Sequence, residues 1–187
     1  MMATSTLIVP GLHGSEPEHW QSWWQQHDVN AVRVHQQDWH NADLTRWSQR
    51  VEAAIQAAYP QKVWLVAHSF GCLASIQAAL KNPRHIAGLF LVAPADPDRF
   101  GIDHALLNQP LPFPSLLIAS TNDPYLAFHK AIGWGQAWGS QIINLGQVGH
   151  INVASGFGAW PQGRRLFDYF KSQFSEAELD DYWRLSA

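Results

Sequence analysis

The chain has 187 residues, of which 47% are hydrophobic and 14% are charged, and its formal net charge is −3. This length and composition exclude a disordered chain and favour a single globular domain over residues 1–187 with one sizeable core. The sequence has neither a net positive charge nor a cluster of Lys and Arg, so it predicts no binding to nucleic acid.

Export and membrane signals are also missing from the sequence. The start, MMATSTLIVPGLHG, has no basic segment, and its apolar run is only Leu7-Ile8-Val9. The longest apolar stretch, IAGLFLVAPA, is about half as long as a membrane-spanning helix requires. Cys72 is the only cysteine, which excludes an intrachain disulfide and zinc sites built on several thiolates. We therefore expect a cytoplasmic protein that does not associate with membranes.

Short apolar runs alternate with segments of helical periodicity along the chain. The runs lie at Thr6–Val9, Ala31–Val34, Val63–Ala67, Gly88–Val92, Ser115–Ala119 and Gln141–Leu145. Helices are predicted around Trp20–Trp24, from Leu44 to Ala58 after an Asp43 cap, from Leu73 to Leu80, from Phe128 to Trp138 and after Pro161. This alternation predicts an α/β fold with a parallel sheet of about six strands and helices on both faces. Because the runs are mostly apolar on both sides, the strands are expected to be buried on both faces.

The segment VWLVAHSFGCLASIQAAL, residues 63–80, places Ser69 between a predicted strand and a predicted helix. Such a sharp turn needs small residues two positions away on each side, and Ala67 and Gly71 meet this need. The segment is typical of a nucleophile elbow, with Ala in place of the first Gly of G-x-S-x-G. The N–H of Phe70 would then face an oxyanion. The alternative is that Ser69 only caps the helix.

A serine nucleophile requires a base and an acid, which in this arrangement follow it in the order acid, then His. Asp123, in STNDPY, and His150, in GQVGHIN, each follow a predicted strand, at the same edge as Ser69. Asp123 precedes a proline, so it could instead be a turn former. Asp96, in VAPADPD, is a rival acid. The adjacent His68 is not expected to be the base, because neighbouring residues in an elbow point apart.

The glycine-rich loop VPGLHGSEPEHW supplies the second N–H of a predicted oxyanion hole. Leu12 is the favoured donor and His13 is the alternative register. His13 and Trp39 are predicted to border the substrate pocket. The loop lacks the glycine spacing of a phosphate-binding motif, so no cofactor is predicted. His35 and His40 suggest no third ligand by their spacing, so no metal site is predicted.

Only the 20 residues from Ala95 to Pro114 could cover the predicted site, and we refer to them as the cap. They contain four prolines and could form at most a short helix around Asp103 to Leu107. This minimal cap predicts a shallow pocket for small substrates. The acidic tail from Ser175 carries Leu179, Tyr182 and Trp183, which could dock on the domain.

Five stretches together resemble a family of small serine hydrolases that includes retinoblastoma-binding protein nine and many short bacterial proteins. The stretches are PGLHGSEPEHWQSWW, QQDWHNADLTRW, LVAHSFGCLAS, LLIASTNDPY and VGHINVASGFGAWPQG. The resemblance runs from about Leu7 to Phe170. It implies a compact α/β-hydrolase without the two outer N-terminal strands of larger members, with Ser69, Asp123 and His150 as the catalytic residues. The motif L-x-C-x-E of the vertebrate member is absent around Cys72, so no protein partner is predicted.

Two functions from different classes are compatible with these features. The first is a serine hydrolase that acts through an acyl-enzyme on a small ester or related acyl substrate. The second is a binding or interaction protein that kept the fold and lost useful turnover. A missing member of the predicted triad would favour the second function, and the sequence contains all three residues.

Overall fold

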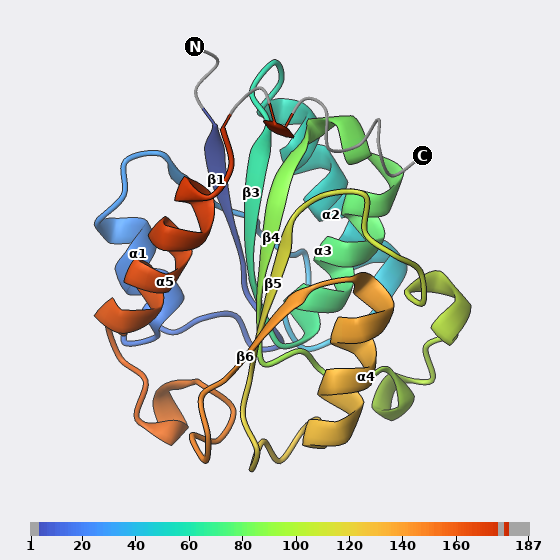
Figure 1. Ribbon diagram of the computed structural model, residues 1–187, viewed down its shortest axis with the longest axis vertical. Helices are drawn as coiled ribbons and strands as arrows, with labels where there is room; N and C mark the ends of the chain where they lie inside the picture. The colour runs from blue at the N-terminus through green and yellow to red at the C-terminus, as the bar shows by residue number, and fades with distance from the viewer. Residues whose placement is uncertain (1–3, 176–177, 180–187) are drawn as a thin grey trace.

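Six parallel strands form one sheet in the order β2-β1-β3-β4-β5-β6 (Figure 1). The structure is a computed structural model that describes residues 4–175 and 178–179. The predicted Tyr182 and Trp183 contacts lie outside these described residues. The strands are β1 (Ser5–Val9), β2 (Ala31–Arg33), β3 (Val63–His68), β4 (Ile86–Val92), β5 (Ser115–Ala119) and β6 (Gln141–Asn144).

Helices cover both faces of this sheet. Figure 1 shows α1 and α5 on one face and α2, α3 and α4 on the other. The helices are α1 (Trp20–Gln26), α2 (Leu44–Ala57), α3 (Phe70–Lys81), α4 (Phe128–Trp138) and α5 (Pro161–Ser172). The α/β fold predicted from the alternating runs is therefore confirmed. Asp43 caps α2 as expected, since its side chain accepts a hydrogen bond from the N–H of Arg46.

The core has two parts because the strand side chains alternate between the two faces of the sheet. Leu65 and Ala67 of β3 point into the cluster under α2, α3 and α4. Trp64 and Val66 point into the cluster under α1 and α5. All four are at most 2% exposed, which explains why the β3 sequence reads as a continuous apolar run.

The connection from β4 to β5 is the cap. It contains two short 3-10 helices, η2 (Pro97–Phe100) and η3 (His104–Leu106), where the sequence predicted only one short helix. The indole N–H of Trp138 donates a hydrogen bond to the Leu107 carbonyl, and Lys130 of α4 contacts the Asp96 carboxylate at 2.7 Å. These contacts attach the cap to α4. No helix within residues 4–175 and 178–179 combines the length and apolar character needed to cross a bilayer.

Candidate active site

Ser69 occupies the turn between β3 and α3 with φ 55° and ψ −125°, a conformation that is rare for a residue with a side chain. A Cβ on Gly71 would lie 2.4 Å from the Pro10 carbonyl oxygen, and one on Gly11 would lie 2.7 Å from the Ser69 Cβ. The loop after β1 therefore packs directly on the elbow, and both glycines are required by this contact. The Ser69 side chain makes no capping hydrogen bond, which contradicts the helix-cap alternative.

Asp123 and His150 meet at the carboxyl ends of β5 and β6. The Nδ1 atom of His150 lies 3.0 Å and 2.9 Å from the two carboxylate oxygens of Asp123. The side chains are 7% and 4% exposed, so water barely screens the pair. The rival acid Asp96 contacts Lys130 at 2.7 Å and accepts a hydrogen bond from the N–H of Asp98 instead.

Ser69 and His150 line the same pocket, but they are not hydrogen-bonded to each other. Among the described residues, the Ser69 hydroxyl has no hydrogen-bond partner, while His150 is held through Nδ1 by Asp123. Catalytic hydrogen bonds in structures without substrate are often long and shorten in the complex. Within the described residues, an imidazole oriented by Asp123 and a hydroxyl without a partner therefore line one pocket.

The backbone N–H groups of Leu12, His13 and Phe70 are the candidates for an oxyanion hole at Ser69. The N–H of His13 donates to the Trp39 carbonyl at 2.8 Å, so it is already used. Within the part of the chain that the structure describes, the N–H groups of Leu12 and Phe70 donate to no other residue. Leu12 is thus the better of the two registers that the sequence left open.

The pocket around Ser69 has a volume of about 540 Å³. Its walls combine apolar groups with polar ones. The residues that line it are Leu12, His13, Gly14, Glu16, His19, His68, Ser69, Ala95, Asp96, Arg99, Phe100, Tyr125, His150 and Asn152.

Trp39 is not part of this lining, which corrects the prediction that it borders the pocket. Its ring lies 3.6–3.7 Å from the position of a Cβ on Gly14, and it makes an edge-to-face contact with Trp47. Trp39 therefore packs against Gly14 of the loop after β1 instead of lining the pocket. His13 does line the pocket, and its Nδ1 lies 3.0 Å from Nδ1 of His40.

The sequence profile of the serine hydrolase family matches residues 6–169. The chain belongs to the serine hydrolase family. This confirms the resemblance found in the sequence. No curated protein matches the chain.

Solved structures show the same fold for this serine hydrolase family member. A YdeN-like hydrolase from Pectobacterium atrosepticum is 40% identical, with 90% of this chain and 91% of that chain covered and a TM-score of 0.85. The ydeN gene product of B. subtilis is 20% identical, with 91% and 100% covered and a TM-score of 0.70. Esterase 2 of Thermogutta terrifontis with bound butyrate is 16% identical, with 91% and 83% covered and a TM-score of 0.67.

Tyr125 and Arg99 form the rim of the pocket and were not singled out in the sequence. The Tyr125 ring lies edge-on to His150, with the ring centroids 4.5 Å apart. Arg99 of the cap donates to the Pro124 carbonyl at 2.7 Å and lies over the Tyr125 ring. The cap thereby holds the loop that carries Asp123. Nothing in the local sequence pattern indicates this contact.

Two buried histidines, His19 and His68, were also missed as members of the site. Burial, the charge of Arg33 and the nearby His150 lower the pKa of His19 to about 3. Burial, His19 and His150 also lower the pKa of His68 well below its usual value. Both rings are therefore neutral near neutral pH, and both lie in the wall of the pocket.

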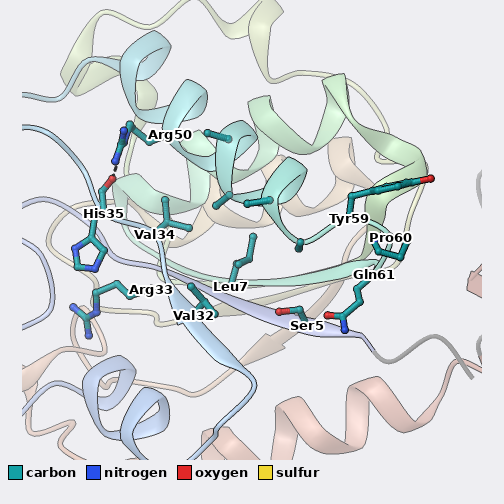
Figure 2. Close-up of a pocket in the computed structure, with 14 residues that line it drawn as sticks. Ser5, Leu7, Val32, Arg33, Val34, His35, Arg50, Tyr59, Pro60 and Gln61 are labelled. Atoms are coloured by element: carbon teal, nitrogen blue, oxygen red, sulfur yellow. Dashed lines mark hydrogen bonds between the residues drawn. The ribbon is translucent and has the colours of Figure 1, made fainter.

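Another cavity, of about 630 Å³, lies between β2 and α2, away from Ser69 (Figure 2). Figure 2 shows Leu7, Val32 and Val34 along it, with Tyr59 at one end and Arg50 at the other. Its lining contains no carboxylate that could serve as an acid or a metal ligand. Across residues 4–175 and 178–179, no group of three His, Cys, Asp or Glu side chains is arranged to hold a metal ion.

Proposed function

We propose that this chain works as one domain that hydrolyses a small carboxylic ester, with Ser69 as nucleophile, His150 as base and Asp123 as the orienting acid. The observation that carries the proposal is the buried contact between Asp123 and His150 Nδ1 at 2.9 Å. It leaves Nε2 of His150 as the reactive nitrogen, in the pocket that also holds the elbow serine. Membership of the serine hydrolase family supports the same chemistry.

In this proposal His150 removes the hydroxyl proton of Ser69 while the serine oxygen attacks the ester carbonyl. The N–H groups of Leu12 and Phe70 stabilise the negative charge on the carbonyl oxygen. His150 then gives its proton to the leaving alcohol as the carbon–oxygen bond breaks, which leaves an acyl group on Ser69. A water molecule, deprotonated by His150, then attacks the acyl group. The bond to the Ser69 oxygen breaks, His150 returns the proton to that oxygen, and the acid is released.

The short cap supports a small substrate. Within the cap, the 3-10 helix η2 provides one wall of the pocket through Arg99 and Phe100. The butyrate held by the T. terrifontis esterase, which shares this fold, supports a short acyl group here. A long acyl chain would leave part of its apolar surface in water, at about 0.8 kcal/mol for each CH₂.

Covalent labelling tests the proposal. A fluorophosphonate probe should modify the folded protein, and mass spectrometry should locate the adduct on Ser69. Ser69→Ala should abolish both labelling and hydrolysis of p-nitrophenyl butyrate. Ser75→Ala is the matched control, since Ser75 is a buried serine of α3 outside the pocket. Absence of labelling in the folded wild type would favour the binding-protein alternative.

A further inference from the structure

His19 and His68 form a pair of imidazoles in the pocket wall beside His150. The ring centroids of His19 and His68 lie 4.9 Å apart, and those of His68 and His150 lie 4.8 Å apart. His19 is 2% exposed and His68 is 5% exposed. Two buried polar rings at this position cost folding free energy unless their nitrogens find partners.

Backbone contacts fix the proton position on each ring. Nδ1 of His19 accepts a hydrogen bond from the N–H of Gln21 at 3.2 Å, so the proton of the neutral ring is on Nε2. Nε2 of His68 lies 2.9 Å from the His150 carbonyl, which can only accept, so Nε2 of His68 is the donor. His68 therefore keeps a lone pair on Nδ1. Burial lowers the pKa of both rings, which keeps these tautomers uncharged.

The second nitrogen of each ring is unused by the protein. No described residue bonds to Nε2 of His19 or to Nδ1 of His68. Among the described residues, the side-chain N and O atoms that are buried and lack a hydrogen-bond partner are Ser75 Oγ and Gln77 Oε1. The two ring nitrogens also lack a partner but are not among these buried atoms, so they reach a surface. That surface is the pocket, since both residues line it. The wall thus offers one hydrogen-bond donor on His19 and one acceptor on His68, in rings whose centroids lie 4.9 Å apart.

A hydroxyl group matches this pair, because it accepts one hydrogen bond and donates another. His68 lies against His150 and His19 lies against His68, and this order decides which part of the substrate the two rings meet. His150 must protonate the leaving alcohol, so the alcohol part of the ester lies on the His150 side of the pocket. An alcohol with a second hydroxyl would place that group against His19 and His68.

We propose that His19 and His68 bind a free hydroxyl on the alcohol part of the ester, which makes monoesters of diols or polyols the preferred substrates. The inference rests on the proposed function. It assigns His19 as a specificity-determining residue: its Nε2–H donates to the substrate hydroxyl, which in turn donates to Nδ1 of His68. A simple alkyl ester would leave both nitrogens without a partner.

Two esters of the same acid test this inference. 2-Hydroxyethyl butyrate and propyl butyrate differ by one hydroxyl in place of one methyl group of similar size. The kcat/KM ratio of the two esters is divided by the ratio of their alkaline hydrolysis rates, which removes the difference in intrinsic reactivity. We expect the corrected ratio to favour the hydroxyethyl ester by about tenfold, the effect of about one well-formed hydrogen bond.

A variant pair then locates the effect. His19→Asn removes the ring nitrogen from the pocket, while Asn remains a good N-cap for α1. The corrected ratio should fall to about one in His19→Asn. His27→Asn changes a histidine at the other end of α1, outside the pocket, and should keep the wild-type ratio. Thermal melting confirms that both variants fold.

The outcomes separate this inference from the proposed function. A wild type that is labelled by fluorophosphonate but shows a corrected ratio of about one overturns the hydroxyl site alone. A ratio that persists in His19→Asn does the same. A folded wild type that is not labelled and hydrolyses neither ester overturns the proposed function and the inference with it. The wild-type ratio requires no variant, so the test does not depend on how His19→Asn folds.

Discussion

Replacing Gly71 by Ala measures how tightly the loop after β1 holds the elbow. The added Cβ would lie 2.4 Å from the Pro10 carbonyl oxygen and 2.5 Å from the Val9 carbonyl oxygen. These are backbone atoms at the end of a central strand, so they cannot rotate away as a side chain would. Overpacking costs about 1–3 kcal/mol, and contact with backbone makes the upper part of that range applicable.

Gly71 is the second residue of α3, where the helical preference for Ala over Gly opposes this loss by at most about 1 kcal/mol. The net expectation for Gly71→Ala is a free energy of unfolding lower by about 2 kcal/mol. Gly133→Ala is the matched control, since Gly133 lies inside α4 and a Cβ there meets no atom within 4 Å. It should raise the free energy of unfolding by about 0.5–1 kcal/mol.

Urea unfolding compares the two variants with the wild type. With a slope of about 2 kcal/mol/M, the midpoint should fall by about 1 M in Gly71→Ala and rise by about 0.4 M in Gly133→Ala. Fluorophosphonate labelling of Ser69 should also slow in Gly71→Ala, because the shift moves the neighbouring Phe70 N–H. If both variants were equally stabilised and labelled normally, the close packing between the loop and the elbow would be refuted.

Four further outcomes follow from the structure. Asp123→Asn should lower kcat by up to about 10⁴-fold, as in a serine protease, while Asp96→Asn should change it little; the opposite result would transfer the acid role to Asp96. Stability should fall as pH drops below about 6.5, because the lowered pKa values of His19 and His68 mean that the unfolded chain binds more protons than the folded one. Urea titrations at about pH 7 and about pH 5 should show a loss of up to about 1.4 kcal/mol per pH unit for each histidine, and equal stabilities would contradict their burial as neutral rings. Ser75→Ala should raise the free energy of unfolding by about 1 kcal/mol, because the buried Ser75 hydroxyl has no partner within the described residues; a lower melting temperature would show that it has one. On p-nitrophenyl esters, kcat/KM should peak between acetate and butyrate without activation by micelles, and an optimum at long acyl chains would show that the cap covers the pocket.

Element order and fold class were predictable from the sequence. The predicted run Ser115–Ala119 and the predicted helix Phe128–Trp138 agree with β5 and α4 to the residue. A strand that is buried on both faces has a continuous apolar run, and a helix that is buried on one face has apolar residues at helical spacing. Both patterns are visible in the residues of the element itself. The start of β4 was placed at Gly88, whereas the strand begins at Ile86, because the buried Ile86 and Ala87 add no periodic signal of their own.

The candidate triad was also predictable, since each member follows a strand and parallel strands bring their carboxyl ends to one edge. Position alone left Asp96 as a rival of Asp123, because both follow strands of the same sheet, and the resemblance to the family favoured Asp123. In the structure, the Asp123 carboxylate contacts His150 and the Asp96 carboxylate contacts Lys130.

Tertiary structure alone decided the surroundings of the candidate triad. Trp39 was expected in the pocket from its position after a strand, yet it packs behind Gly14 and against Trp47. His19 lies at the start of α1 and His68 beside Ser69, and only the fold brings His19 against His68 and His68 against His150. The periodicity of apolar residues in a sequence indicates which side chains face the core. Which group each of them meets there depends on contacts between distant segments, and these form only when the sheet and its helices pack together.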